Sequence, residues 1–331
     1  MNKFTRYATT SQTLSLTAME EASRRGLREA DLEDMFLALV LNDQPAGQVL
    51  RDAGISIHSA RTAVEAYQKD QIASLGITAE LPPPGDIVFH ETGGYAWSKR
   101  ASDLLGRAGQ KGRTGDASAV LRELLNEPSG LITGVLQRLG TAPAKILAEL
   151  ERTESSIESP KKPAAGSRGE ATGSFEAFVP APVEDVWALL SDPARIPEWE
   201  PGIGSVEDTG GPLLPGHTWT AHATLTRPDG KPLKVHEKFR HREIELLEAR
   251  PPAQVTWHFT FPDTRASRPT VICFELAPAT GGTQVSITLT WFRHQGWRAM
   301  IGTLLAPLQR FLVWIKLSQI GSSLSRVFRQ S

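Results

Sequence analysis

The clearest pattern in this chain is an alternation of apolar and polar residues in its second half. Apolar side chains occupy every second position, with polar or small residues between them, in four stretches: Trp219–Leu225, Val255–Phe261, Ile272–Leu276 and Val285–Trp291. A period of two places these two sets of side chains on opposite faces of a β-strand. Turn residues at Pro228–Gly230 and Gly281–Gly282 separate some of these stretches, so they predict an antiparallel meander with one apolar face.

Helical signals flank the alternating stretches. A short strand over Phe175–Val179 is followed by Ala181–Trp187, where Pro182 and two acidic residues are typical of a first helical turn. Ser191-Asp192-Pro193 ends that helix, and Ile196–Trp199 forms a second short one. We expect this helix pair to lie under the sheet.

The last apolar segment, Gly296 to Arg329, is predicted to form one long helix. Its apolar residues recur at helical spacing, at Met300, Leu304, Leu308, Phe311 and Ile315. We expect a kink at Pro307 and burial of this stripe on the concave face of the sheet. Arg310 and Lys316 interrupt the segment, which argues against a membrane span.

The first half contains an internal repeat at a constant offset of 86 residues. The matched pairs are Ala22 with Ala108, Gly26 with Gly112, Met35 with Leu121, Leu39 with Leu125, Val49 with Val135, Leu50 with Leu136 and Gly54 with Gly140. Each copy has helical periodicity and ends at a glycine suited to a helix C-terminus. We therefore predict an all-helical pair of repeats of about four helices each, joined by a stiff turn at Leu81–Gly85.

The composition divides the chain into three parts. Residues 1–153 hold the repeats, residues 154–173 are rich in proline, glycine, serine and charge, and residues 174–331 hold the alternating stretches. A segment with the composition of residues 154–173 buries too little apolar surface to offset the entropy lost on ordering. This composition therefore predicts a flexible linker.

Charge and cysteine content exclude several classes of function. The net charge is -1 with no basic stripe, so we expect no nucleic-acid binding. The single cysteine, Cys273, excludes an internal disulfide and fits a reducing compartment. The N-terminus lacks the apolar core of a secretory signal, so we expect a cytoplasmic protein without a membrane span.

The alternation also predicts which residues would contact an apolar ligand between sheet and helix. The predicted wall is formed by Trp219, Ala221, Ala223, Trp257, Phe259, Ile287 and Leu289 on the sheet, facing Leu304, Leu308 and Phe311 on the long helix. Ala221 and Ala223 are the best local sign of space, because their side chains are small. The alternative is that these positions form only a packed core.

Catalysis in such a cavity would need a positioned acid or base. All three tyrosines precede residue 100, and the parity of the strands turns His222 and His258 to solvent. His217 shares the inward parity of Trp219, and His236, Glu237 and Arg240 are placed on a strand of unassigned facing, so only His217 and Glu237 are candidates. Cys273 has no partner that would activate it, and no cofactor or metal-binding trio is expected.

The second half resembles the SRPBCC superfamily, which includes START-type, birch-pollen-allergen and polyketide-cyclase proteins. The resemblance rests on Phe175–Leu190, on Ser191 through Trp199, and on Gly302–Leu308, in that order. It implies a helix-grip fold, an antiparallel sheet wrapped on a long C-terminal helix, whose cavity takes lipids, sterols or aromatic polyketides.

The first half resembles the N-terminal domain of the Clp ATPases. Ala18–Gly26, Leu32–Leu41 and Val49–Gly54 carry the likeness in the first copy, and Leu121–Leu125 and Val135–Gly140 in the second. The sequence departs from the family at Ala30–Asp34, where the family has a Gly-Thr-Glu-His-Leu stretch. No phosphate-binding loop of the form G-x-x-x-x-G-K-[ST] occurs, so the resemblance implies a protein-contact module without an ATPase.

Three functional hypotheses follow. In the first, residues 174–331 bind a hydrophobic small molecule without catalysis, and residues 1–153 contact a protein partner. The second is a polyketide cyclase, aromatase or dehydratase-like enzyme that uses His217 or Glu237. The third is an adaptor for Clp-type machinery, with the sheet domain as a recognition body; a helical domain that serves only as a scaffold or dimer surface is also open.

Overall fold

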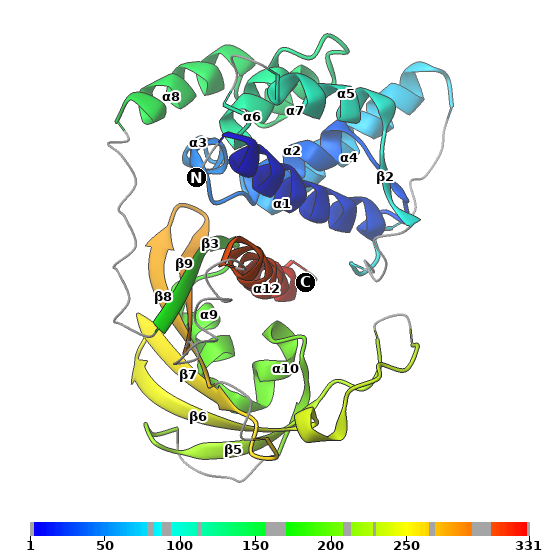
Figure 1. Cartoon of the computed structure of the whole chain (residues 1–331). Coiled ribbons are helices and arrows are strands. Elements are labelled where there is room, and N and C mark those ends of the chain that lie inside the picture. The colour runs from blue at the N-terminus through cyan, green and yellow to red at the C-terminus, as the bar shows by residue number, and fades with distance from the viewer. Residues whose placement is uncertain are drawn as a thin grey trace. The chain divides into compact units, whose positions relative to one another are not determined.

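The computed structural model describes residues 3–77, 83–87, 94–110, 114–156, 170–207, 213–227, 230–264, 269–292 and 306–329. The chain divides near residue 160 into two compact units, a helical unit and a sheet unit (Figure 1). Each is described on its own below.

The helical unit contains eight helices among its described residues. They are α1 (Lys3–Arg24), α2 (Leu32–Val40), α3 (Pro45–Asp52), α4 (Ile57–Ser74), α5 (Lys99–Ala108), α6 (Ala117–Leu125), α7 (Leu131–Arg138) and α8 (Pro143–Ser156). The unit is not purely helical, since two-residue strands β1 (Glu29–Ala30) and β2 (Ala96–Trp97) pair in parallel. These strands are too short to leave an alternation in the sequence.

Helix positions recur along this unit at the offset found in the sequence. Adding 86 to the bounds of α3 gives those of α7, and adding it to the first residue of α4 gives that of α8. The helix ends recur as well: Gly26, Gly54 and Gly140 have φ angles of 72°, 82° and 71°. The N–H of each glycine donates to the carbonyl three residues before it, and the N–H of the next residue donates to the carbonyl five residues before that residue. This is the hydrogen-bond pattern of a Schellman motif at a helix C-terminus. Gly112 lies outside the described residues.

A buried ion pair connects the first and fourth helices of the helical unit. Arg61 on α4 donates from Nε and Nη2 to the two carboxylate oxygens of Glu21 on α1, both at 2.9 Å. The Glu21 side chain has no exposed surface and that of Arg61 is 7% exposed. Two parallel hydrogen bonds of this kind fix both side chains and offset much of the cost of burying their charges.

The sheet unit is built on one antiparallel sheet in the order β3-β9-β8-β7-β6-β5-β4. Its strands are β3 (Glu170–Val179), β4 (Ile203–Val206), β5 (Thr218–Ala223), β6 (His241–Arg250), β7 (Gln254–Thr260), β8 (Thr270–Ala279) and β9 (Gly282–Phe292). The chain order confirms the predicted meander from β5 to β9, with β3 returning to pair with β9. β4 and β6 lie outside the four alternating stretches, and a register shift between Leu246 and Glu248 interrupts the period of β6.

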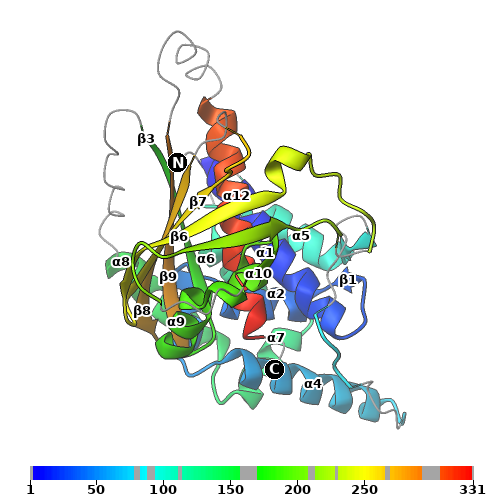
Figure 2. The same ribbon diagram turned by 90° about the horizontal axis from the view of Figure 1, so that it is seen from below.

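Three helices lie on the concave face of the sheet (Figures 1 and 2). They are α9 (Val183–Ser191), α10 (Ile196–Trp199) and α12 (Ala306–Val327), and α12 packs mainly against β3, β9 and α10. Trp257 on β7 anchors α9 by donating from Nε1 to the Leu190 carbonyl at 2.9 Å. The sequence and the fold therefore agree on a helix-grip arrangement with a helix pair under the sheet.

Several local predictions need correction. Pro182 precedes the first turn of α9 instead of lying within it. The predicted linker overlaps ordered elements at both ends, because α8 runs to Ser156 and β3 begins at Glu170. The described part of the last helix begins at Ala306, so the segment before the predicted kink at Pro307 lies outside the described residues. Among the helices that the structure describes, none has the length and apolar character needed to cross a bilayer.

Candidate functional site

The seven sheet residues predicted to line a ligand wall all lie in the core of the sheet unit. Their exposed fractions range from 0% for Ala221, Trp257 and Ile287 to 8% for Ala223. Trp219 and Trp257 meet edge to face with ring centroids 5.7 Å apart. The predicted parity of these strands is confirmed by their burial, and their role as ligand contacts remains a prediction.

The long helix meets this core with a different set of residues from the predicted one. Leu317, Ile320 and Leu324 of α12 are completely buried in the same apolar cluster. Phe311 is 52% exposed and stacks on Trp314 instead of covering the sheet. Leu304 and the side chain of Leu308 lie outside the described residues. Among the side chains of α12 that the structure describes, the fully buried positions therefore begin at Leu317, six residues after Phe311.

A group of three charged side chains lies at the edge of this core, and we refer to Glu200, Arg242 and Lys316 as the charged cluster. Glu200, immediately after α10, is 4% exposed. Its Oε1 lies 3.7 Å from Arg242 Nη1 on β6, and its Oε2 lies 3.4 Å from Lys316 Nζ on α12. Burial lowers the pKa of Arg242, and the nearby Glu200 carboxylate opposes that shift. Three elements distant in sequence thus place two cations around one carboxylate.

The charged cluster is poorly supplied with hydrogen bonds. Within the described residues, Arg242 Nε, Glu200 Oε2 and the Nε1 of the adjacent, fully buried Trp199 are all buried without a hydrogen-bond partner. Buried polar atoms in folded proteins nearly always have a partner, so the open atoms of the paired Glu200 and Arg242 mark a place for water or a ligand.

Small residues make room for Arg242. Ala221 on β5 is its direct cross-strand partner, and a β-carbon on Gly202 would lie only 2.7 Å from Arg242 Nη2. The guanidinium also lies 5.1 Å above the ring of Phe261, which meets Phe239 edge to face at 5.4 Å. The small side chain of Ala221 was predicted to leave room for a ligand, and the Arg242 side chain takes part of that room.

The two candidate acid-base residues are placed differently. The ring of His217 packs against Trp219 with centroids 4.5 Å apart, and its buried Nε2 has no hydrogen-bond partner within the described residues. Glu237 is exposed on a 3-10 helix, Glu237–Phe239, instead of a strand. It lines a separate surface pocket with Lys238, Arg240, His241 and Asp263. The structure thus places the half-buried His217 against the core residue Trp219 and leaves Glu237 on the surface.

His222, His258 and Cys273 of the sheet unit belong to its surface pattern. His222 contacts Glu207 at 2.8 Å and His258 contacts Glu245 at 3.0 Å, both on the polar face predicted for them. Cys273 accepts a hydrogen bond from Gln254. Over the described ranges, no group of three or more histidine, cysteine or acidic side chains has an arrangement that could hold a metal ion.

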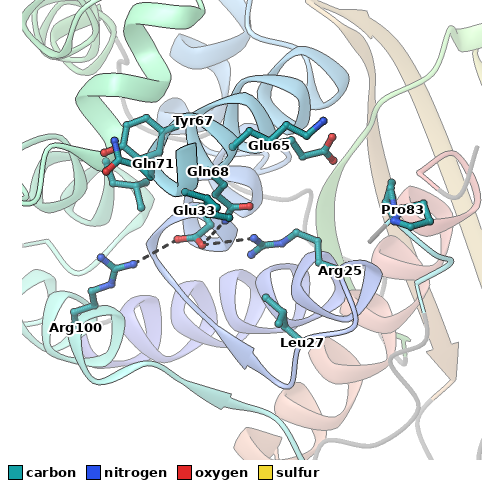
Figure 3. Close-up of a pocket in the computed structure, with 13 residues that line it drawn as sticks. Arg25, Leu27, Glu33, Glu65, Tyr67, Gln68, Gln71, Pro83 and Arg100 are labelled. Atoms are coloured by element: carbon teal, nitrogen blue, oxygen red, sulfur yellow. Dashed lines mark hydrogen bonds and ion pairs between the residues drawn. The ribbon is translucent and has the colours of Figure 1, made fainter. Parts of the chain in front are cut away.

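The helical unit has a pocket of about 610 Å³ (Figure 3). It is formed by the end of α1, α2, α4, the start of α5 and α7, together with Pro83 and Pro84. Leu27, Ile72, Leu131 and the two prolines make an apolar wall. This pocket was not predicted, because its walls come from both halves of the repeat.

Glu33 is the centre of the polar part of that pocket. Its Oε1 accepts from Gln68 Nε2 at 3.0 Å and lies 3.5 Å from Arg25, and its Oε2 lies 3.7 Å from Arg100 (Figure 3). Oε2 has no hydrogen-bond partner among the described residues, although Glu33 is only 8% exposed. Burial would lower the pKa of Arg25, but the charges of Asp34 and Glu33 outweigh it and raise that pKa. An open carboxylate oxygen in an apolar pocket can accept one donor from a ligand.

Sequence reasoning missed the charged cluster entirely. Its one accessible signal was that Arg242 shares a period of two with Ile244 and Leu246, which places an arginine on an inward face. Glu200 carried no such signal, because its burial depends on a turn after a four-residue helix. Lys316 appeared only as a charge that argued against a membrane span.

The match to a known protein family falls within the sheet unit. Residues 171–312 match the family model described as polyketide cyclase / dehydrase and lipid transport. Among curated proteins there is no match. Protein CV1439 from Chromobacterium violaceum is 15% identical, with a TM-score of 0.36 over 48% of this chain and 98% of its own.

Two further solved structures are similar to part of this chain. Protein Ms6760 from Mycobacterium smegmatis is 20% identical, with a TM-score of 0.33 over 48% of this chain and 90% of its own. The di-domain ARO/CYC StfQ from the steffimycin biosynthetic pathway is 15% identical, with a TM-score of 0.36 over 60% of this chain and 59% of its own.

Proposed function

We propose that residues 174–331 bind a hydrophobic small molecule, of lipid or polyketide-like character, between the sheet and the helices on its concave face. The observation that carries this proposal is the group of buried, unpartnered polar atoms at the edge of an aromatic core. A domain that served only as a packed body would gain nothing from leaving such atoms open. The match of residues 171–312 to a family of polyketide cyclases and lipid transporters supports the same proposal.

Retention of a ligand during purification tests this proposal. The full chain is purified without detergent, and denatured extracts are analysed by mass spectrometry against a matched preparation of the variant Trp219→Ala. We expect an apolar compound in the wild type at close to one equivalent and a reduced amount in the variant, because Trp219 is 4% exposed in the aromatic core. An empty wild-type protein that also takes up no added long-chain alcohol would contradict the proposal.

An enzymatic function, a polyketide cyclase, aromatase or dehydratase, is the second candidate. The observation that favours it is the buried, unpartnered Nε2 of His217 beside Trp219. Such a nitrogen can exchange a proton with a bound carbonyl compound. His217→Gln should then abolish turnover of a poly-β-ketone with little loss of binding, whereas Glu237→Gln, at an exposed position, should leave turnover unchanged. Unchanged turnover in both variants would leave the binding function alone.

For residues 1–153 we propose contact with a protein partner, in agreement with their resemblance to the Clp N-terminal domain. The pocket around Glu33 supports this, because its apolar wall and open carboxylate oxygen fit an extended peptide with a basic side chain. A role as adaptor for Clp-type machinery is the more specific form of this proposal.

Peptide arrays probed with the full chain test the contact with a partner. We expect binding to peptides that combine basic and apolar residues, and Glu33→Gln should weaken it about tenfold, the usual effect of removing a charged hydrogen-bond acceptor. Glu29→Gln is the matched control, since Glu29 is exposed on β1. Equal binding of both variants would exclude this pocket as the contact.

A further inference from the structure

The charged cluster of Glu200, Arg242 and Lys316 in the sheet unit combines buried charge with open hydrogen-bonding atoms. We infer that this cluster binds the anionic oxygen group of the ligand, so that the preferred ligand is an apolar monoanion of the carboxylate class. The inference rests on the proposed function and specifies the chemistry of the molecule bound there. It is carried by the hydrogen-bonding capacity of the site and by its surroundings.

The cluster has more donors than acceptors. Arg242 and Lys316 together carry eight N–H bonds by their chemistry. Among the described residues, Glu200 is the carboxylate paired with both cations, and its distances of 3.7 Å and 3.4 Å to them exceed a good hydrogen bond. Its Oε1 is also approached by the Gly202 N–H at 3.4 Å. Over the described part of the cluster, N–H donors therefore outnumber oxygen acceptors.

The net charge of the cluster also favours a ligand with one carboxylate. Two cations and one carboxylate leave one positive charge, and Arg242 is only 16% exposed. An uncompensated charge in a low-dielectric environment is unfavourable, and a single negative charge neutralises it. A carboxylate does so and also presents two oxygens to the guanidinium. A doubly charged phosphate group would instead leave one negative charge.

Apolar side chains beside the charged cluster indicate that the ligand also has an apolar part. Phe261 lies under the Arg242 guanidinium and Phe239 meets Phe261, and Phe239 is 37% exposed. On α12, Leu312 lies one turn before Lys316 and is 56% exposed. The Lys316 side chain itself is 41% exposed, so the cluster can be reached from solvent past apolar side chains. A molecule with its carboxylate on Arg242 and Lys316 would cover these side chains with its hydrocarbon part.

Calorimetric titration of the full chain with decanoate and 1-decanol tests the inference. The two probes share one hydrocarbon chain, and only decanoate carries a charge. We expect the wild type to bind decanoate at least about tenfold more tightly, since hydrogen bonds to charged groups are worth about ten- to hundredfold in affinity. Arg242→Met should remove this preference and leave decanol affinity within about threefold.

Two further variants make the test decisive. Arg250→Met removes the same charge from an exposed position of β6, where the side chain is 68% exposed, and should leave both affinities unchanged. Lys316→Met serves as the test if Arg242→Met fails to fold, because Lys316 is half-exposed and its replacement should not unfold the protein. It should lower the preference for decanoate about three- to tenfold. Equal wild-type affinity for both probes, or a preference that survives both cluster variants, would overturn the inference and leave the proposed function intact. Failure of the wild type to bind either probe would overturn both.

Discussion

Each unit of this protein buries an arginine beside a glutamate, and the two pairs differ in how completely they are satisfied. In the helical unit, Arg61 meets Glu21 through two hydrogen bonds of 2.9 Å. In the sheet unit, Arg242 is 3.7 Å from Glu200 with no hydrogen bond to it, and Nε of Arg242 has no partner among the described residues. Both pairs are largely buried, so they differ in their hydrogen bonds and not in their exposure to solvent.

The difference indicates which buried charges hold a fold together and which await a ligand. We call an ion pair closed when its hydrogen bonds are complete, because a further donor or acceptor from a ligand would then add little binding energy. An open group retains its desolvation penalty until something completes it. By this criterion the Arg61–Glu21 pair is structural, and the charged cluster is the group proposed to bind a ligand.

Removing one partner of the closed pair should have the largest effect on stability. Glu21→Ala leaves the buried Arg61 without its carboxylate and should lower the free energy of unfolding of the helical unit by about 3–5 kcal/mol. Urea unfolding of the full chain followed by circular dichroism measures this change. Asp103→Ala removes the partner of Lys99 at a surface position, and should change that free energy by no more than about 0.5 kcal/mol. Similar losses in both variants would mean that the closed pair is not structural.

Two buried tryptophans offer a second comparison of closed and open groups. Trp257 donates to the Leu190 carbonyl, whereas the indole N–H of Trp199 has no partner among the described residues. Trp257→Phe should therefore cost about 2–3 kcal/mol in the free energy of unfolding, about 1 kcal/mol more than Trp199→Phe. Thermal unfolding of both variants without ligand gives the difference. The opposite order would mean that Trp199 has a partner in the free protein.

The close approach of Arg242 can be disturbed from the backbone. In Gly202→Ala the new β-carbon would lie 2.7 Å from Arg242 Nη2 and 3.0 Å from Glu200 Oε1. We expect a loss of about 1–3 kcal/mol in the free energy of unfolding from this crowding, and a weaker preference for decanoate. Gly106→Ala on α5 meets nothing within 4 Å and should stabilise by about 0.5–1 kcal/mol. Denaturation of the two variants side by side separates crowding at the cluster from a general effect of alanine.

The smallest effect concerns an ionised cap in the helical unit. Burial would raise the pKa of Asp31, but hydrogen bonds from Arg100, Ser98 and the Leu32 N–H outweigh it and hold that pKa below its ordinary value of 3.8. A depressed pKa stabilises the fold at pH values above 3.8, and this contribution is lost as the pH falls through the folded-state pKa. Asp31→Asn should cost about 1 kcal/mol in unfolding free energy at pH 7 and progressively less as the pH falls below 3.8. A difference that stays constant with pH would exclude this ionisation as the cause.

Much of the fold could be predicted from periodicity. The alternation around Trp219, Trp257 and Ile287 gave the strands and their inward faces, because burial on one face repeats every second residue. The strand β6 was missed because a register shift after Leu246 breaks that repeat. The candidate wall was only partly located: the sheet side was placed in the core, while Phe311 on the helix side is exposed.

The charged cluster could not be predicted, for a different reason. Glu200, Arg242 and Lys316 are far apart in sequence and lie on three different kinds of element. Each alone reads as a solvated charge, since charged side chains are usually exposed. Their proximity depends on the register of β5 with β6 and on the position of α12 against α10.

Local spacing along the chain was enough to predict the recurrence of helices in the first half and the inward and outward faces of the main strands. Both follow from helix and strand periods, which are set by the backbone. Which buried charges are satisfied could be seen only in the folded protein. Whether Arg61 or Arg242 finds a complete set of acceptors depends on distances between separate elements, and these are fixed by packing.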